Sequence, residues 1–556
     1  MGLARAHAIA LVGVQGHPVE IEADIENGMV ALLLVGLPDT ALREARDRIR
    51  AAIVNSGETW PTRRITVGLS PASLPKRGSG FDLGIAMAIL AAAESVPAAA
   101  LHGLVLIGEL GLDGRVRPVP GVLPAAAAAA AAGFDAVAVA AENAAEAALV
   151  PELRVVATPS LSAFATYIRS GRRAGDAGVQ VLEPGRDLDS VYGAVRDAGP
   201  GRAPGGSRTA EATARAVRAG SGGSGALAVA TSTVPADAKD LADLVGQPVA
   251  RRAAEICAAG GHHLMLLGPP GCGKTMLAER IPTVMPRLDP AAALEVSAIH
   301  SVAGTLPPGR PLLVEPPFCA PHHTATRAAI VGGGSGIIKP GAASLAHHGC
   351  LFLDEAPEFG RDVLDGLRQP LESGEVVVAR AGVTARFPAR FTLIMAANPC
   401  ACASASTAGA ACSCTPLARR RYLARLSGPL LDRVDAKIEF LPVRRAELLS
   451  DRAFTEPSSV VAERVSAARL RAAARLAGTP WRLNAEIPGS ELRRTFAPAA
   501  NALAPLERAM DLGRISARGA DRVIRLSWTL ADLAARPRPA AAEVGYALGL
   551  WLGTPR

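Results

Sequence analysis

The sequence predicts an α/β protein with at least two domains, and three observations lead to this prediction. The chain has 556 residues, which is too long for one compact core. Its first 170 or so residues alternate strand-like segments such as ITVGL and AVAVAA with helical runs such as TALREARDRIRAAIVNSG. Near the middle, HLMLLGPPGCGKTMLAERI combines an apolar strand, a glycine-rich loop and the start of a helix.

Composition divides the chain into four segments. Residues 1–172 are expected to form the first α/β domain, and residues 237–445 the second. Between them, residues 173–236 are expected to be a flexible linker, because the Gly-, Ala-, Arg- and Ser-rich stretch 199–226 has one larger apolar residue, Val217. The remainder, 446–556, is expected to be helical.

Charge and cysteine content narrow the class of protein. The formal net charge of +8 permits binding to a polyanion such as nucleic acid without establishing it. Eight cysteines in a chain of this length do not make a disulfide scaffold. The apolar start could pass for a signal peptide, but no small-residue cleavage site follows and VEIEADIE alternates like a strand. We therefore expect a cytoplasmic protein without a membrane span.

The glycine-rich loop has the residues of a phosphate-binding loop. Its spacing fits G-x-x-x-x-G-K-[ST] from Gly268 to Thr275. Backbone N–H groups and the helix N-terminus would bind phosphate oxygens, Lys274 would neutralise the β- and γ-phosphates, and the Thr275 hydroxyl would face Mg²⁺. A chance Gly-Lys turn is disfavoured by the flanking strand and helix. The predicted ATP-binding residues are Gly268, Pro269, Pro270, Gly271, Cys272, Gly273, Lys274, Thr275 and Asp354.

Two adjacent acids end a second apolar strand in LFLDE. Asp354 is predicted to hold Mg²⁺, directly or through water, and Glu355 to activate the attacking water. The alternative is an acidic pair that caps the following turn, which the upstream phosphate loop makes less attractive. A third strand, FTLIMAANP, ends at Asn398, which would orient water near the γ-phosphate unless it is only a turn former before Pro399.

Two arginines are candidates for stabilising charge on the transferring phosphoryl group. Arg433 lies in GPLLDRVD, and Arg518 lies in ISARGAD within the helical tail. A surface salt bridge is the default interpretation of either residue in a chain so rich in arginine.

The order of these motifs resembles that of the AAA+ ATPases. GGHHLMLLGPPGCGKTMLAERI, FCAPHHTATRAAIVGGG, PGAASLAHHGCLFLDEAPEF, LSGPLLDRVD and VGLPDTALREARDRIRAAIVNSG look like the YifB/ComM family of magnesium-chelatase-like ATPases. The resemblance covers nearly the whole chain except the linker. It implies an AAA+ core with a C-terminal helical lid, ATP and Mg²⁺ as cofactors, Asn398 as the first sensor, Arg433 as an arginine finger and Arg518 as the second sensor.

The same resemblance implies an assembly and a substrate. A finger that reaches a neighbouring subunit requires a homo-oligomeric ring, expected to be a hexamer. The family resemblance implies branch migration of branched or single-stranded DNA during integration by homologous recombination. An insertion near 300–345 and a hairpin at 375–387 also match the family, and in related motors such hairpins line the pore. Arg380, Arg386 and Arg390 would suit phosphate contacts there, and the alternative is a solvated hairpin. The alternatives are a chelatase-type ATPase that remodels a protein partner, and a regulatory ATPase with an unknown protein client.

The N-terminal domain resembles the Lon protease domain, with its ribosomal-S5-type α/β fold. The catalytic Ser-Lys dyad of that fold is absent. Asp82 or Leu83 stands at the serine position, and Leu123 stands near the lysine position. Peptidase activity is therefore not expected, and an assembly or substrate-binding collar is the more plausible role.

A segment rich in cysteine follows Asn398. The spacing C-x-C, nine residues, C-x-C could bind Zn²⁺ through Cys400, Cys402, Cys412 and Cys414, although C-x-C is less usual than common zinc spacings. The alternative is reduced thiols in a surface loop. The adjacent histidines at 262–263, 322–323 and 347–348 are predicted to be poor chelates, because neighbouring residues on a strand point to opposite faces.

Overall fold

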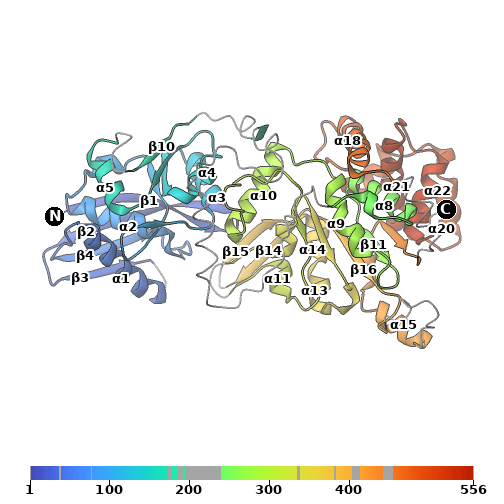
Figure 1. Ribbon diagram of the computed structural model, residues 1–556, viewed down its shortest axis with the longest axis horizontal. Coiled ribbons are helices and arrows are strands. Elements are labelled where there is room, and N and C mark those ends of the chain that lie inside the picture. Colours follow the sequence, from blue (N-terminus) through green and yellow to red (C-terminus); the bar gives the residue numbers. More distant parts are fainter. Residues whose placement is uncertain are drawn as a thin grey trace.

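The computed structural model describes residues 2–36, 39–76, 78–172, 178–184, 192–193, 239–334, 338–380, 383–402, 414–442 and 455–554. Figure 1 shows an elongated molecule with the N-terminal domain at one end, the phosphate-loop domain in the middle and the C-terminal helices at the other end. Within the described ranges, every helix is too short or too polar to cross a bilayer.

The N-terminal domain is built on an eight-stranded mixed sheet with the order β10-β9-β8-β5-β1-β2-β4-β3. Antiparallel pairing of β1 with β2 sets the long central ribbon, with Ala6 opposite Ile21. The strands are β1 (Gly2–Val12), β2 (Gln15–Glu26), β3 (Ala31–Val35), β4 (Arg64–Ser70), β5 (Leu104–Leu106), β8 (Ala136–Ala140), β9 (Arg154–Thr158) and β10 (Gln180–Leu182). A small hairpin joins β6 (Glu109–Leu110) to β7 (Val116–Arg117).

Strand alternation sends side chains to two cores, one on each face of this sheet. Ala136 and Ala138 pack with α1 (Asp39–Asn55), α2 (Asp82–Ala92) and α5 (Leu161–Arg169). Between them, Val137 points to the other face, which is covered by α3 (Val122–Ala131) and α4 (Ala144–Ala147). Strands β5, β8 and β9 are therefore buried on both faces, as strands between two helical layers are expected to be.

The sheet extends beyond the domain end predicted from the sequence. Residues 180–182 were expected in the flexible linker, but they form β10, whose Val181 pairs with Val156 of β9. Val181 and Leu182 of β10 pack against the two cores of the sheet, and the pairing covers the edge that β9 would otherwise expose. Most of the expected linker, including Val217, lies outside the described residues.

The phosphate-loop domain contains a five-stranded sheet with the order β12-β13-β16-β11-β17. Each neighbouring pair is parallel, so the carboxyl ends of the strands meet at one edge. The strands are β11 (Leu264–Leu267), β12 (Phe318–Cys319), β13 (Cys350–Leu353), β16 (Thr392–Ala397) and β17 (Ala436–Glu439).

Helices cover both faces of the central sheet. One face packs on α8 (Pro248–Gly260) and α9 (Lys274–Val284), and on helices of the C-terminal segment. The other face packs on α10 (Pro290–Ala303), α11 (Arg327–Val331), α12 (Ala342–Leu345), α13 (Arg361–Gly366) and α16 (Gly428–Leu431). Further elements are α14 (Arg368–Ser373), α15 (Pro416–Leu423) and the antiparallel hairpin β14 (Glu375–Arg380) and β15 (Val383–Pro388).

The C-terminal segment is helical, as its sequence pattern predicts. It consists of α18 (Ser458–Arg475), α19 (Gly489–Arg494), α20 (Ala504–Asp511), α21 (Ala517–Leu533) and α22 (Ala541–Leu552). A buried ion pair joins it to the central sheet: Arg522 Nη1 of α21 lies 2.8 Å from Asp435 Oδ1, just before β17. The pKa of Asp435 is affected first by burial, which raises it, but Arg522 and the neighbouring histidines lower it below its usual range. The ion pair between Arg522 and Asp435 therefore links α21 to the segment that leads into β17.

The N-terminal domain docks on the central domain through α10. Leu288, Ala293 and Val296 of this region share a buried cluster with the outer face of the N-terminal sheet. The Ser301 hydroxyl of α10 donates a hydrogen bond to Glu146, and the backbone N–H of Gly121 donates to the Ser301 carbonyl at 3.0 Å. The insertion expected near 300–345 begins at the end of this helix, where Ser301 contacts the N-terminal domain.

Candidate active site

The predicted phosphate loop lies at the carboxyl edge of the central sheet, between β11 and α9. Gly271 and Gly273 have φ angles of 76° and 100°, which side chains with a Cβ adopt only under strain. A Cβ on Gly268 would lie 2.6 Å from the Cβ of Phe440. Glycine at these positions therefore lets the backbone fold tightly before the N-terminus of α9, where N–H groups can receive an anion.

Lys274 is held inside this loop. Its Nζ donates to the carbonyl oxygens of Gly268 at 2.7 Å and Pro269 at 2.8 Å, and to Asn398 Oδ1 at 3.1 Å. The residue is 7% exposed. Since Asn398 follows β16, the contact joins the predicted first sensor to the loop lysine across neighbouring strands. Burial is the main influence on Cys272 beside them and raises the pKa of its thiol, so the thiol is neutral rather than nucleophilic.

A hydroxyl and a carboxylate lie together beside the loop. Thr275 Oγ1 donates to Asp354 Oδ2 at 2.7 Å, and the backbone N–H of Glu355 donates to Asp354 Oδ1 at 2.9 Å. These are hard oxygen ligands of the kind that Mg²⁺ prefers, so the donor set fits the predicted metal.

Glu355 has a left-handed backbone, with φ of 51°, at the end of β13. This conformation is uncommon for a residue other than glycine and is often found at functional sites. Its Oε2 lies 3.3 Å from Nδ1 of His323, and both side chains are partly exposed. The sequence predicts only that His322 and His323 form a poor chelate, and it does not reveal this contact with Glu355. The position of His323 shortly after β12 could have suggested the contact with Glu355, but only if the order of the strands in the sheet were known.

The two candidate arginines lie in a cluster of positive charge. Arg433 follows α16, donates to the Pro429 carbonyl and pairs with Glu372 of α14. Burial lowers the pKa of Arg433, and the nearby charges of Arg522, Arg368 and Arg518 lower it further. Its Nε is buried and has no hydrogen-bond partner among the residues that the structure describes. The described contacts of Arg433 are therefore with Pro429 and Glu372, and they do not include the phosphate loop.

Comparison with known proteins places this geometry in a family. Residues 240–448 match the family described as magnesium chelatase, subunit ChlI, residues 21–143 match subunit ChlI of Mg-chelatase, and residues 455–550 match the ChlI C-terminal family. The chain is 37% identical to competence protein ComM of Haemophilus influenzae over 552 residues, which cover 99% of this chain and 97% of ComM. The chain belongs to the YifB/ComM family of magnesium-chelatase-like proteins.

Other relatives in the family align over similar lengths. The chain is 37% identical to YifB of Escherichia coli K12 over 534 residues, covering 96% of this chain and 94% of YifB. An uncharacterized protein of Mycobacterium tuberculosis H37Rv is 46% identical over 548 residues, covering 99% of this chain and 98% of that protein. The family resemblance inferred from the motifs is thus confirmed.

The histidine pairs of this YifB/ComM member serve different contacts. His262 Nε2 lies 2.7 Å from Thr529 Oγ1, while His263 Nδ1 accepts from the Leu393 backbone N–H at 3.1 Å. These contacts tie β11 to α21 and to β16. Burial is the largest influence on His263 and lowers its pKa to about 4, so its ring is neutral and suited to accepting this hydrogen bond.

The expectation that adjacent histidines diverge was wrong for His347 and His348. They lie in a turn rather than a strand, His348 has φ of 56°, and the ring centroids are 4.0 Å apart. The Nε2 atoms of His347 and His348 approach Glu295 Oε2, at 3.1 Å and 3.3 Å. However, His347 Nδ1 accepts from the Arg390 backbone N–H at 3.0 Å, so the neutral ring carries its proton on Nε2 and cannot offer that nitrogen to a metal.

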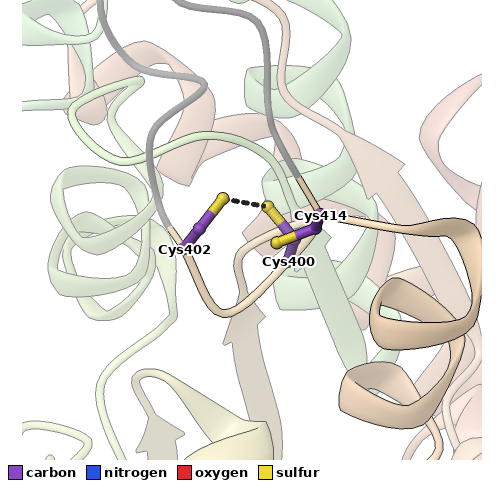
Figure 2. A group of neighbouring side chains, drawn as sticks. All are labelled: Cys400, Cys402 and Cys414. Carbon is purple, nitrogen blue, oxygen red and sulfur yellow. Dashed lines mark hydrogen bonds between the residues drawn. The ribbon is translucent and has the colours of Figure 1, made fainter.

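The cysteine segment brings three sulfur atoms together (Figure 2). The Sγ atoms of Cys400 and Cys402 are 3.2 Å apart, and the ligand atoms of Cys400, Cys402 and Cys414 all lie within 4.8 Å of one another. Cys412, the fourth predicted ligand, lies outside the described residues. Cys400 follows β16 and Cys414 precedes α15, so the cluster connects the sensor strand to that helix.

The hairpin arginines have different surroundings. Arg380 donates from Nη1 to the Gly334 carbonyl, and Arg386 pairs with Glu375 on the partner strand at 2.7 Å. Arg390 follows the hairpin, and its carbonyl accepts from the His348 backbone N–H at 2.6 Å. Ala385 and Phe387 of β15 pack on Leu11 and Val12 of the N-terminal domain. One side of the hairpin therefore contacts the N-terminal domain, and the arginines at 380, 386 and 390 are exposed.

Proposed function

We propose that this chain is an ATP-hydrolysing AAA+ ring motor that acts on DNA and drives branch migration during homologous recombination. The observation that carries the proposal is the set of contacts linking Lys274, Asn398, Thr275 and Asp354 at the carboxyl edge of a parallel sheet. Family membership supports the use of ATP and Mg²⁺, and the name of the relative ComM supports a role connected with competence.

The proposed residues have separate roles in hydrolysis. Lys274 neutralises the phosphate charge, and Thr275 and Asp354 hold Mg²⁺, which when bound draws charge from the β- and γ-phosphates. Glu355 accepts a proton from the attacking water, and Asn398 orients that water. The contact between Lys274 and Asn398 supports this division, because it places sensor and lysine at one edge of the loop.

We propose that Arg433 acts on ATP held by a neighbouring subunit in a homo-oligomeric ring, most simply a hexamer, and that Arg518 is the second sensor, which acts on the γ-phosphate. The position of Arg433 supports this, because its described ionic partner, Glu372, is an exposed carboxylate that a phosphate could replace.

DNA is the proposed substrate of the ring. The net charge of +8 and the exposed arginines of the β14–β15 hairpin support contact with the phosphate backbone. Arg380 is the best placed, because its described partner is a neutral carbonyl, whereas Arg386 is paired with a carboxylate. The cellular site of this activity is proposed to be the cytoplasm.

The decisive experiment uses a labelled four-way junction with ATP and Mg²⁺. We expect ATP-dependent branch migration, ATP hydrolysis stimulated by DNA, and binding that weakens steeply with salt. Lys274→Ala is the matched inactive protein. If DNA does not stimulate ATP hydrolysis, and the junctions remain intact and unbound, DNA is not the substrate.

A protein-remodelling ATPase of the chelatase type is the second candidate. It is favoured by similarity to the magnesium-chelatase 38 kDa subunit of Acidiphilium rubrum, which is 43% identical over 61 residues. That match covers 11% of this chain and 18% of the subunit, whereas ComM aligns over nearly the whole chain. The DNA motor is therefore the better supported proposal.

We propose that the N-terminal domain is a Lon-like collar without peptidase activity. Asp82, at the position expected for a nucleophile, is buried and bonded bidentately to Arg48 at 2.6 Å and 3.0 Å. Leu123 is buried in the apolar cluster that contacts α10. A paired carboxylate and an apolar side chain cannot replace an activated serine and its lysine base.

We also propose that Cys400, Cys402 and Cys414 bind Zn²⁺, with Cys412 as the fourth ligand by its spacing. A tetrahedral zinc with Zn–S bonds of about 2.3 Å holds its sulfur atoms about 3.8 Å apart. The described sulfur atoms, within 4.8 Å of one another, need little movement to reach this geometry (Figure 2). A zinc ion at this site would cross-link the two ends of the segment between Asn398 and α15.

Metal analysis of the purified, reduced protein tests the zinc proposal. We expect about one zinc per chain, because four thiolates complete a closed structural site. Cys402→Ser and Cys414→Ser should each lose most of this metal, while Cys272→Ser, outside the cluster, should retain it. A metal content that is the same in all four proteins, or zero in the wild type, would contradict the site.

A further inference from the structure

One long segment of the central domain carries positive charge and no negative charge. Residues 376–431 contain seven arginines and no Asp, Glu or Lys. Three of these arginines lie in or just after the β14–β15 hairpin, and the other four lie on or just after α15. Figure 1 shows α15 at the lower right, where it projects from the central domain, well apart from the hairpin. This segment therefore presents positive charge at two separate places.

The helix α15 extends into solvent from a buried anchor. Residues 415–421, which include most of α15, are all exposed. Successive residues of a helix point about 100° apart, so a run of this length is open on every side. At the carboxyl end, Tyr422 and Leu426 are buried. Burial, followed by the charges of Glu358 and Glu355, raises the pKa of Tyr422 to about 12. The helix is thus fixed near the proposed catalytic base, and its arginines are held in place rather than carried on a loose loop.

The charges of α15 are unusual for a helix that only faces solvent. Opposite charges four residues apart stabilise an exposed helix and like charges destabilise it, and here Arg421 and Arg425 occupy such positions. Arg425 pairs with Glu358 at 2.7 Å, but Arg420 and Arg421 have no ion pair among the residues that the structure describes. A cleft of about 600 Å³ lies between Arg421 and Phe359. The guanidinium groups of Arg420 and Arg421 are therefore accessible to a further partner.

We propose that Arg420 and Arg421 bind the phosphate backbone of DNA, as a contact separate from the β14–β15 hairpin. The inference rests on the proposed function of the chain as a motor that acts on DNA. A guanidinium group binds two phosphate oxygens at once, and such contacts do not depend on base sequence, as branch migration requires. A branched substrate has more than one arm, so two separated contacts let the protein hold two parts of one junction.

The test measures binding of the full-length protein to a fluorescent four-way junction, by anisotropy at several salt concentrations. Arg420→Gln/Arg421→Gln replaces the two charges with neutral amides. Each phosphate contact on duplex DNA contributes about 0.9 to the slope of log K against log salt, so we expect the slope to become shallower by about 1.8. The ratio of wild-type to variant affinity should then be about twelvefold larger at about 50 mM salt than at about 200 mM.

Arg493→Gln/Arg494→Gln is the matched control. These exposed arginines are adjacent and lie in the last turn of α19, so the variant removes the same charge from an equivalent position on another helix. Its slope should equal that of the wild type. An equal change of slope in both double variants would show an effect of net charge and overturn the proposal. The proposal also fails if Arg420→Gln/Arg421→Gln lowers the thermal transition but keeps the wild-type slope, because the arginines then only stabilise the end of the helix.

Sedimentation of the protein with ATP tests the other possible partner of α15, an acidic surface of a neighbouring subunit. We expect Arg420→Gln/Arg421→Gln to form the same assembly as the wild type, and a smaller assembly would place α15 at a subunit interface instead of on DNA. If the double variant does not fold, the two single variants carry the same comparison, each with half the change in slope. Wild-type protein that leaves the junction unbound would refute the DNA motor itself, whereas wild-type binding with an unchanged variant slope rejects the contact through α15 alone.

Discussion

Lys274→Ala is expected to lose ATP binding and hydrolysis together, whereas Glu355→Gln is expected to bind ATP and fail to hydrolyse it. Lys274 is 7% exposed, and its ammonium group donates to carbonyl and amide oxygens, so its charge faces the loop rather than solvent. Without it, the phosphate charge has lost its nearest cation, and the rate should fall at least about a hundredfold.

Glu355→Gln separates chemistry from binding. The amide has nearly the shape of the carboxylate but cannot accept the proton of the attacking water, so kcat should fall by about 10² to 10⁴ with little change in ATP affinity. Asp354 and Thr275, which form the proposed Mg²⁺ site, are left in place.

Binding of a fluorescent ATP analogue and phosphate release measure the two quantities independently. Lys239→Ala, whose amine pairs with Glu279 at the surface, and Glu358→Gln, whose carboxylate pairs with Arg425, are matched controls that should retain both. Hydrolysis by Glu355→Gln at the wild-type rate would show that another group accepts the proton.

The residues that could be located from the sequence have roles fixed by local spacing. Lys274 and Thr275 stand at set positions between a strand and a helix, and Asp354 and Asn398 end apolar strands that can only be buried. Parallel strands bring their carboxyl ends to one edge, so the contacts of Lys274 with Asn398 and of Thr275 with Asp354 agree with that reasoning.

The features that could not be predicted depend on packing between distant segments. His323 reaches Glu355 only because β12 lies beside β13, an order that no local pattern specifies. Docking of α10 on the N-terminal sheet depends on apolar residues, such as Val296, that would suit any core. His348 and Glu355 also have left-handed backbone, so their side chains do not follow the alternation of directions that holds along an extended strand.

Arg433→Ala is expected to abolish ATP hydrolysis while leaving ATP binding intact. An arginine finger contributes about 10³ to 10⁵ in kcat, because its charge is needed only as charge develops on the transferring phosphoryl group. In the single chain Arg433 pairs with Glu372, and its described contacts do not reach the phosphate loop. The expected loss therefore depends on a neighbouring subunit. Arg361→Ala, at a side chain 84% exposed, is the matched control and should hydrolyse normally.

Mixing two inactive variants tests whether Arg433 acts on a neighbour. In rings formed from equal amounts of Arg433→Ala and Glu355→Gln, an intact base of one subunit meets an intact finger of the other at about a quarter of the interfaces. Hydrolysis should then reappear, although each variant alone is inactive. An arginine that serves the ATP of its own chain gives no active pair in any mixture, since every subunit lacks one of the two groups. Recovery of activity would therefore place Arg433 across a subunit interface, and its absence in rings verified to be mixed would place the finger elsewhere.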